Sequence, residues 1–180
     1  MRRSVLLLAL VWLGACASLS ENECRTASWE RIGYDDGARG AARSRRGAHV
    51  DACLEYGIAM DQEAWEAGYE QGLDAYCTPE NALRIGLAGG EYKGVCPPES
   101  DFAFSSHWRA ARVVFDQRQR VSELDNRRRT LEYALEEARS DEERRSIRSE
   151  LARLDYEQRA ERDRLMYEES RLNQFSRGIR

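Results

Sequence analysis

The spacing of apolar residues changes midway along the chain and predicts two kinds of helical structure. In the second half, apolar residues and a few polar ones recur at alternating intervals of three and four, which is typical of a helix that packs along another helix. One such seam comprises Val114, Gln117, Val121, Leu124, Arg128, Leu131, Leu135 and Ala138. A second comprises Ile147, Leu151, Leu154, Gln158, Glu161, Leu165, Glu168, Leu172 and Phe175.

The two seams predict an antiparallel helical hairpin, or coiled coil, over residues 107–175. They are out of phase by two residues, which a single insertion of three or four would not produce. Between them, Ser140 and Glu143 form an S-x-x-E capping box, a signature of a helix start. One unbroken helix is the alternative, because neither Gly nor Pro lies between Glu99 and Arg177. Residues 176–180 are predicted to be a disordered tail.

Residues 27–106 are predicted to form a separate small helical domain. A loose repeat runs through it, because "WERIGYDDGARG" from Trp29 is echoed by "WEAGYEQGLDAY" from Trp65, each with a Gly-Tyr-x-x-Gly core. The glycines share one helical face in each copy, which would let two helices approach closely and offset the low helix propensity of glycine. The alternative is that these glycines lie in loops.

Capping residues help to place four short helices in this domain. Asp61 is a predicted N-cap, and Thr78-Pro79 reads as an N-cap followed by the first helical position. Gly89-Gly90 would end the helix that Pro79 begins. The predicted helices cover roughly 27–40, 48–56, 62–76 and 79–88. The fold class is therefore all-α, with Gly-containing helices followed by a long hairpin.

The first 15 residues have the organisation of a signal peptide. Arg2 and Arg3 precede an apolar run that is far shorter than a membrane-spanning helix. The next residues, Leu13-Gly14-Ala15-Cys16, resemble the bacterial lipobox. That resemblance implies acylation of Cys16 and cleavage before it, with residues 16–26 as a lipidated anchor and short linker. The alternative is an ordinary secretory signal with a cysteine nearby.

The residues after Cys16 indicate a destination. Ala17 and Ser18 follow the cysteine, with no Asp at these positions. By resemblance to lipoprotein sorting in Gram-negative bacteria, this favours the outer membrane, with the protein anchored by lipid and facing the periplasm.

Cysteine usage fits that compartment. If Cys16 carries lipid, an even number of cysteines remains, which in an oxidising compartment indicates two disulfides. They are Cys24, Cys53, Cys77 and Cys96. Three pairings are open, and consecutive pairing (24 with 53, 77 with 96) would suit successive helical hairpins. A metal site at His49 and Cys53, four residues apart, is the alternative, but no C-x-x-C pair supports it.

Charge argues against nucleic acid as a partner. The formal net charge is −4. Residues 17–106 carry 8 basic and 16 acidic side chains, and residues 107–180 carry 18 and 16. The first half is acidic and the second is near neutral, so neither has the strongly basic surface that a nucleic-acid partner requires.

The pattern from Trp29 to Pro97 resembles an uncharacterised family of proteobacterial lipoproteins, domain of unknown function 2799. Its most specific pieces are Gly68-Tyr69 to Cys77 and Tyr92 to Pro97. At His107-Trp108 the chain departs from a further Tyr-x-x-Gly element expected there. The family has no assigned activity, so the resemblance implies location and architecture only.

We therefore expect a non-catalytic envelope protein that needs no cofactor or metal and binds another envelope protein, or itself, through its C-terminal helices. An enzyme acting on envelope polymers is one alternative, with Asp35, Asp36 and Glu70 as acid and base, but no hydrolase motif accompanies them. A glycan- or small-ligand-binding module is another. Its candidate aromatic residues are Trp29, Tyr34, Trp65, Tyr69 and Tyr92.

Overall fold

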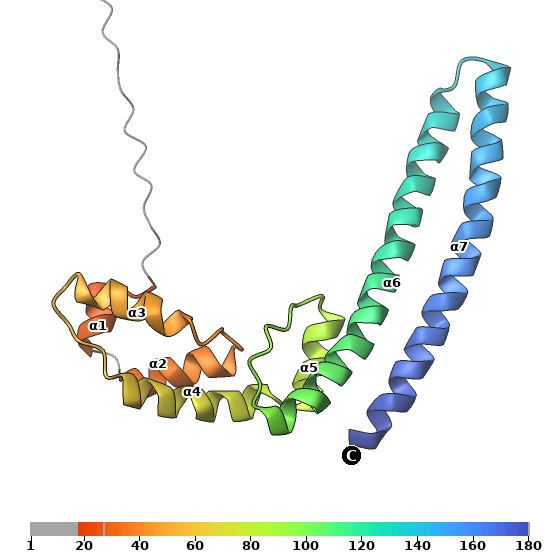
Figure 1. Ribbon diagram of the computed structural model, residues 1–180. Coiled ribbons are helices and arrows are strands. Elements are labelled where there is room, and N and C mark those ends of the chain that lie inside the picture. Colours follow the sequence, from red (N-terminus) through yellow and green to blue (C-terminus); the bar gives the residue numbers. More distant parts are fainter. Residues whose placement is uncertain (1–17, 27, 180) are drawn as a thin grey trace, which may run out of the picture.

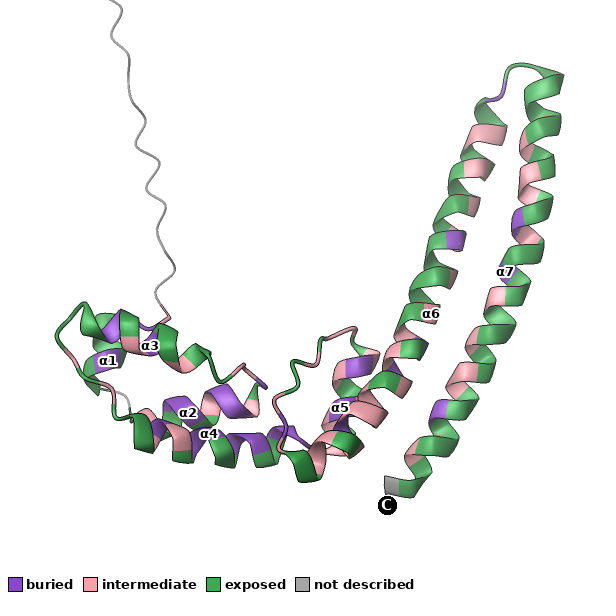
Figure 2. Ribbon diagram, in the orientation of Figure 1, coloured by how far each residue is buried: buried purple, intermediate pink, exposed green. Residues whose placement is uncertain are grey.

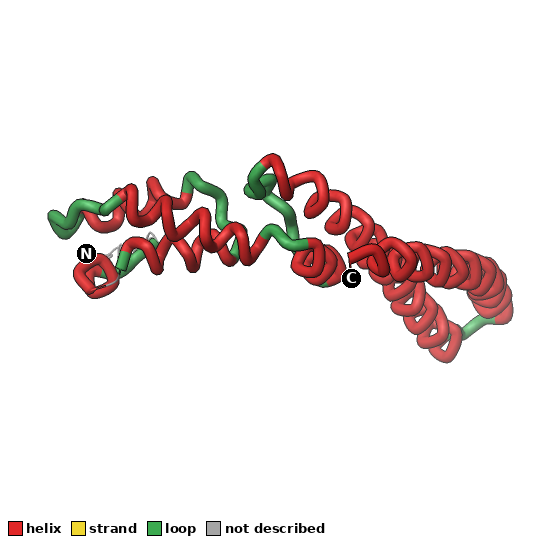
Figure 3. Tube along the Cα trace, turned by 90° about the horizontal axis from the view of Figure 1, so that it is seen from below, coloured by secondary structure: helices red, strands yellow, loops and turns green. Residues whose placement is uncertain are grey.

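The structure is a computed structural model that describes residues 18–26 and 28–179. The signal peptide predicted for residues 1–15 and the lipidation predicted at Cys16 lie outside the described residues. Within them the chain is all-α, as predicted, and contains no strand (Figure 3). The helices are α1 (Glu21–Thr26), α2 (Trp29–Ala38), α3 (Arg45–Leu54), α4 (Gln62–Tyr76), α5 (Pro79–Leu87), α6 (Pro98–Glu137), α7 (Asp141–Ser176) and the 3-10 helix η1 (Arg177–Ile179).

The helices form two parts that share α6 (Figure 1). Helices α1 to α4 gather into a small bundle, and α5 lies against the beginning of α6. We call residues 18–97 the first domain. From there α6 extends away from the bundle and α7 returns beside it, forming the antiparallel hairpin that the two seams predict. No helix in the described part of the chain is both long and apolar enough to cross a bilayer.

Helix boundaries follow the capping residues closely. The Asp61 carboxylate accepts a hydrogen bond from the Ala64 backbone N–H at 2.9 Å, and the Thr78 hydroxyl accepts one from Asn81 at 3.2 Å. The Ser140 hydroxyl accepts from the Glu143 N–H at 3.2 Å, which starts α7. Each side chain satisfies a backbone donor that has no partner within the helix.

Three boundaries differ from the sequence prediction. Helix α1 lies within residues 16–26, which the sequence predicts to be a linker, and Cys24 is its buried residue. Helix α6 begins at Pro98, so the expected division between residues 106 and 107 falls inside a helix. Proline suits the first turn of a helix, where its missing N–H costs nothing. The expected disordered tail also includes residues of η1.

Helices α2 and α4 cross at their glycines. Gly33 and Gly37 of α2 face α4, and Gly68 and Gly72 of α4 face α2. A methyl group at any of these four positions would overlap backbone atoms of the opposite helix. The glycines therefore lie in helices, as the repeat predicts, and the contact is backbone against backbone.

Two disulfides join consecutive cysteines of the first domain. Cys24 pairs with Cys53, linking α1 to α3, and Cys77 pairs with Cys96, linking the end of α4 to the loop before α6. The Cα–Cα distance is 5.6 Å in both pairs. This is the consecutive pairing that successive helical hairpins favour.

The core of the first domain extends into α6 (Figure 2). Phe104 of α6 is fully buried, and its ring centroid lies 5.1 Å from that of Tyr76 and 4.6 Å from that of Tyr92. On the next turns, Gly86 of α5 packs closely against Trp108 and Ala111. The hairpin is therefore built onto the core of the first domain rather than joined to it by a linker.

The polar residues in the hairpin seams bind one another. Gln158 is 2% exposed, accepts a hydrogen bond from Arg128 at 3.2 Å and donates one to Asp125 at 2.8 Å. Gln117 of α6 donates to the backbone carbonyl of Glu161 at 3.0 Å. Because buried polar groups cost free energy unless paired, these bonds fix the register of α6 against α7.

Tyr92 is expected to titrate later than an ordinary tyrosine. Burial, together with the hydrogen bond that its hydroxyl donates to Asp101, raises its pKa to about 12. The stability that the neutral phenol contributes is present below the ordinary pKa of 10 and is lost as pH rises through about 12. Because burial also raises the pKa of Tyr69 and Tyr76, Tyr92→Phe should reduce the late phase of tyrosinate absorbance without abolishing it. The same substitution at Tyr133, which is 66% exposed, should leave that phase in place.

Candidate functional site

A buried polar cluster lies in the first domain where four segments meet. Asp36 of α2 and His49 of α3 are each 2% exposed, and Asp36 Oδ2 lies 2.7 Å from His49 Nε2. The indole N–H of Trp65 in α4 donates to the same Asp36 oxygen at 3.2 Å. On the other side, His49 Nδ1 lies 2.9 Å from the hydroxyl oxygen of Ser18. The cluster ties α2, α3 and α4 to the segment before α1.

The hydrogen-bond directions indicate a charged histidine. The Ser18 hydroxyl donates its proton to the backbone carbonyl of Ala48 at 2.7 Å, so its oxygen is left to accept from His49 Nδ1. The Asp36 carboxylate accepts from Nε2. All these bonds form together when both ring nitrogens carry hydrogen. Asp36 and His49 then make a buried ion pair.

The surroundings of Asp36 favour its ionised form. Burial, the largest influence, would raise its pKa, but hydrogen bonds and charge from His49, Trp65 and Arg39 outweigh burial, so the pKa is lowered. Arg39 and Arg45 reach the second carboxylate oxygen at 3.4 and 3.7 Å. A buried carboxylate with this many donors is held as an anion.

A pocket of about 200 Å³ opens beside the cluster. Its lining includes Asp36 and His49 together with three arginines, Arg31, Arg39 and Arg45. Ser18, His49 and Asp36 follow one another as in a Ser-His-Asp hydrolase site. However, the serine proton is directed to a carbonyl and not to the histidine, so the arrangement does not activate the hydroxyl. In this arrangement Asp36 and His49 act as a structural ion pair.

The carboxylates considered as acid and base are only partly brought together. Asp35 lines the pocket next to Asp36, whereas Glu70 is exposed on α4 and does not line it. The metal alternative at His49 and Cys53 is not supported by the geometry, because Cys53 is in a disulfide and His49 is bonded to Asp36 and Ser18. In the part of the chain that is described, no group of three or more potential metal ligands comes together.

The aromatic residues considered as a ligand platform are mainly core residues. Trp65 and Tyr69 are 0% and 1% exposed, and their rings stack with centroids 4.7 Å apart. Trp29 and Tyr92 are partly buried against the same core. Only Tyr34 of the five is substantially exposed, and a single ring does not form a platform.

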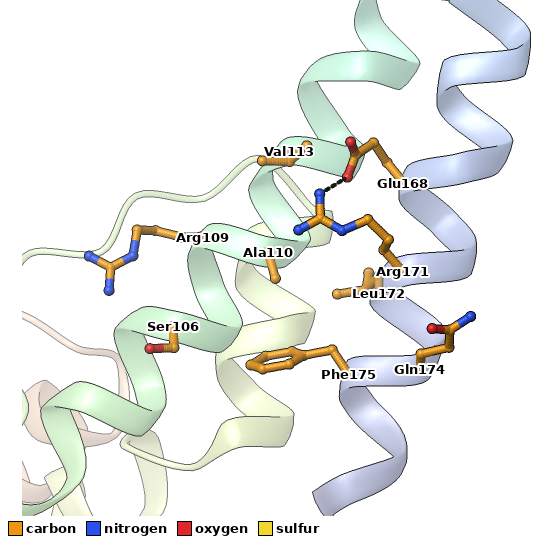
Figure 4. A pocket seen from close by; sticks show the side chains of 9 residues that line it. All are labelled: Ser106, Arg109, Ala110, Val113, Glu168, Arg171, Leu172, Gln174 and Phe175. Carbon is orange, nitrogen blue, oxygen red and sulfur yellow. Dashed lines mark hydrogen bonds and ion pairs between the residues drawn. The ribbon is translucent and has the colours of Figure 1, made fainter.

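A larger surface feature lies at the base of the hairpin (Figure 4). It is a groove of about 590 Å³ between the first turns of α6 and the last turns of α7. The lining residues are Ser106, Arg109, Ala110, Val113, Glu168, Arg171, Leu172, Gln174 and Phe175. Figure 4 shows Phe175 and Leu172 reaching from α7 towards α6, with Arg171 bonded to Glu168 at 3.0 Å.

The groove leaves apolar surface uncovered. Val113 is 47% exposed and Phe175 is 45% exposed, although Phe175 continues the predicted seam. The Phe175 ring contacts His107, with centroids 4.5 Å apart, because α7 ends beside the junction of α6 with the first domain. Apolar side chains rimmed by charged ones are typical of a protein-binding surface.

Sequence reasoning missed the buried cluster. Asp36 lies three residues after Gly33 and next to Gly37, on the face of α2 that meets α4, so a partner for its charge was required. The chain has two histidines, and His49 is the one that supplies that partner. Ser18 gives no such signal, since its role depends entirely on where α3 packs.

The comparisons with known proteins bear on the first domain. Residues 28–113 match a family described as "Protein of unknown function (DUF2799)". This region resembles the DUF2799 family. The DUF2799 region contains α2 to α5 and the beginning of α6, so it includes the glycine crossing and the Asp36–His49 pair, but not Cys16 or α7. No curated protein and no solved structure matches the chain.

Proposed function

We propose that this protein is a non-catalytic lipoprotein of the outer membrane, facing the periplasm, whose α6–α7 hairpin binds another envelope protein or a second copy of itself. The observation that carries the proposal is the hairpin, which extends from the disulfide-bonded domain and exposes an apolar groove at its base. The lipobox-like Leu13-Gly14-Ala15-Cys16 supports the anchor, and two disulfides suit an oxidising compartment.

Position-specific crosslinking in the native membrane tests the binding surface. A photoreactive residue at Val113, in the groove, is expected to capture a protein partner. The matched control is Tyr34, which is similarly exposed at 42% but lies on α2 in the first domain. Capture from Tyr34 and none from Val113 would contradict the assignment of the hairpin as the binding surface.

A second comparison uses a chain that ends at Glu137. Helix α7 packs against α6 and η1, so its removal leaves the contacts of α2 with α4 and of α5 with α6 in place. Partners that need the hairpin should be lost from this shortened chain, whereas partners of the first domain should remain.

Hydrolysis of envelope polymers is the second candidate, because Ser18, His49 and Asp36 lie in hydrogen-bond sequence beside a pocket, although the serine proton is directed to the Ala48 carbonyl. Its test is peptidoglycan hydrolysis by the purified chain, compared with Ser18→Ala. Activity that this substitution abolishes would replace the non-catalytic assignment. A glycan-binding role has less support, because Trp65 and Tyr69 belong to the core.

A further inference from the structure

Along one flank of α7, each acidic residue has a basic residue at the same distance on the other side of the flank's midpoint. The residues are Glu150, Arg153, Glu157, Arg164, Glu168 and Arg171, which we call the α7 flank. They are separated by 3, 4, 7, 4 and 3 positions, so the spacing is symmetric about the point between Ala160 and Glu161. At 3.6 residues per turn this spacing keeps all six on one side of the helix, centred about a quarter turn from the seam that packs on α6, with Glu168 at the edge shared with that seam.

When the flank is read in the opposite direction, a base stands at the position of each acid and an acid at the position of each base. In an antiparallel pair of α7 helices, Glu150 would face Arg171 of the partner subunit, Arg153 would face Glu168 of the partner subunit, and Glu157 would face Arg164 of the partner subunit. Two-fold symmetry makes each contact occur twice. A parallel pair in register would instead place like charges opposite one another.

We propose that two copies of the chain associate antiparallel along the α7 flank, about a two-fold axis that passes between Ala160 and Glu161. This inference rests on the proposed role of the hairpin as a protein-binding surface, and it names the partner as a second copy.

Four of the six charged side chains of this flank are exposed, whereas those of Glu150 and Glu168 are 34% and 18% exposed. Arg164 and Arg171 are 63% and 61% exposed. Arg153 and Glu157 are exposed and make no ion pair within the described residues. Glu161 and Glu168 hold Arg164 and Arg171 at 3.2 and 3.0 Å within the same helix, which orients both guanidinium groups on the surface.

The opposite flank of α7 does not have these properties. There Asp155, Arg162 and Glu169 are bonded across the hairpin to Arg128, Asp125 and Arg118. Those charges hold α7 against α6. On the α7 flank, by contrast, Glu150 alone pairs with α6 within the described residues, since it accepts from Arg127 at 2.6 Å. The other charges of that flank pair only within α7 or make no ion pair in the described part of the chain.

The shape of the flank also suits a symmetric contact. A hollow of about 220 Å³ lies at one end, beside Glu150, Arg153 and Glu157, and the basal groove lies at the other, beside Glu168 and Arg171. Ala160 is exposed at the centre, where a small side chain permits close approach. With this two-fold axis, the hollow of one copy would receive the Glu168–Arg171 end of the partner's flank, and its groove would receive the Glu150–Glu157 end.

The physical character of this contact sets its expected behaviour. Exposed ion pairs are individually weak and are screened by salt, so the association should be selective and salt-sensitive rather than tight. Attachment of both copies to one membrane would favour it by raising their effective concentration.

Charge reversal and exchange in the full-length chain test the proposal. In detergent micelles at low salt, sedimentation velocity is expected to show a monomer–dimer equilibrium for the unaltered chain. Either Glu157→Arg or Arg164→Glu places like charges together at two symmetric positions and should raise the dimer dissociation constant about tenfold or more. The combined variant restores opposite charges and should recover dimerisation.

A mixture of the two single variants is the most specific measurement. Each variant alone repels itself. In the mixture, the arginine introduced at position 157 of one copy would face the glutamate introduced at position 164 of the other, so heterodimers should form. Arg148→Glu, on the opposite flank of the same helix, is the control and should leave dimerisation unchanged. Circular dichroism checks that every variant keeps its helix content.

The outcomes separate this inference from the proposed function. A chain that stays monomeric at low salt, or a combined variant that fails to recover dimers lost in both single variants, overturns the antiparallel pairing. If that chain still crosslinks to other proteins through Val113, the hairpin remains a binding surface and only the pairing falls. Absence of both dimers and hairpin crosslinks overturns both.

Discussion

Replacing Gly68 by alanine is expected to lower the free energy of unfolding by about 3 kcal/mol or more. The added methyl group would overlap the backbone carbonyl of Glu30, and alanine at Gly33 would meet the carbonyl of Trp65 in the same way. A backbone carbonyl within a helix cannot rotate aside as a side chain can, so α2 and α4 must move apart. Urea unfolding followed by circular dichroism measures the loss.

Gly47 provides the matched control for this experiment. It lies within α3, and a methyl group there would have no atom within 4 Å. Because alanine is the better helix former, Gly47→Ala should stabilise the protein by about 0.5–1 kcal/mol. A Gly68→Ala variant as stable as the unaltered chain would show that α2 and α4 do not meet backbone to backbone.

Removal of His49 is expected to be at least as costly. His49→Ala would leave the Asp36 carboxylate buried without its closest cation, and breaking one partner of a buried pair typically costs about 3–5 kcal/mol. The control is Asp35→Asn, because Asp35 lies next to Asp36 but makes no ion pair in the described part of the chain. Its effect should stay within about 0.5 kcal/mol.

The same pair predicts the direction of acid destabilisation. The pKa of Asp36 is lowered from its ordinary value of 3.8, so the stability contributed by its carboxylate is present above that pH and is lost as pH falls through the lower folded value. Unfolding measured between about pH 7 and about pH 2.5 should therefore show a steeper acid limb for the unaltered chain than for Asp36→Asn. Equal limbs would contradict an ionised, hydrogen-bonded Asp36.

Local sequence signals located most of the helices. Asp61, Thr78-Pro79 and Ser140 each cap a helix where the sequence predicts one, because capping involves only a residue and the next three or four positions. The start of α6 was missed because Pro97 and Pro98 also suit a turn. Helix α1 was missed because a single buried cysteine gives no periodicity.

Contacts between distant segments were less predictable. Polar residues such as Arg128, Gln158 and Glu161 interrupt the seams, but which of them meet depends on the register between α6 and α7. The buried cluster likewise combines Ser18, Asp36, His49 and Trp65 from four separate segments. From a single sequence one can infer that a buried Asp36 needs a partner for its charge, but not which residue the packing places beside it.

The continuity of α6 has a mechanical consequence. A helix of 40 residues is about 60 Å long, and its first turns are fixed in the core of the first domain through Phe104. Without a hinge between the two parts, α6 acts as a stiff arm. A force applied by a bound protein near the tip would be transmitted to the disulfide-linked bundle as torque, and the arm sets how far from that bundle a partner can be held.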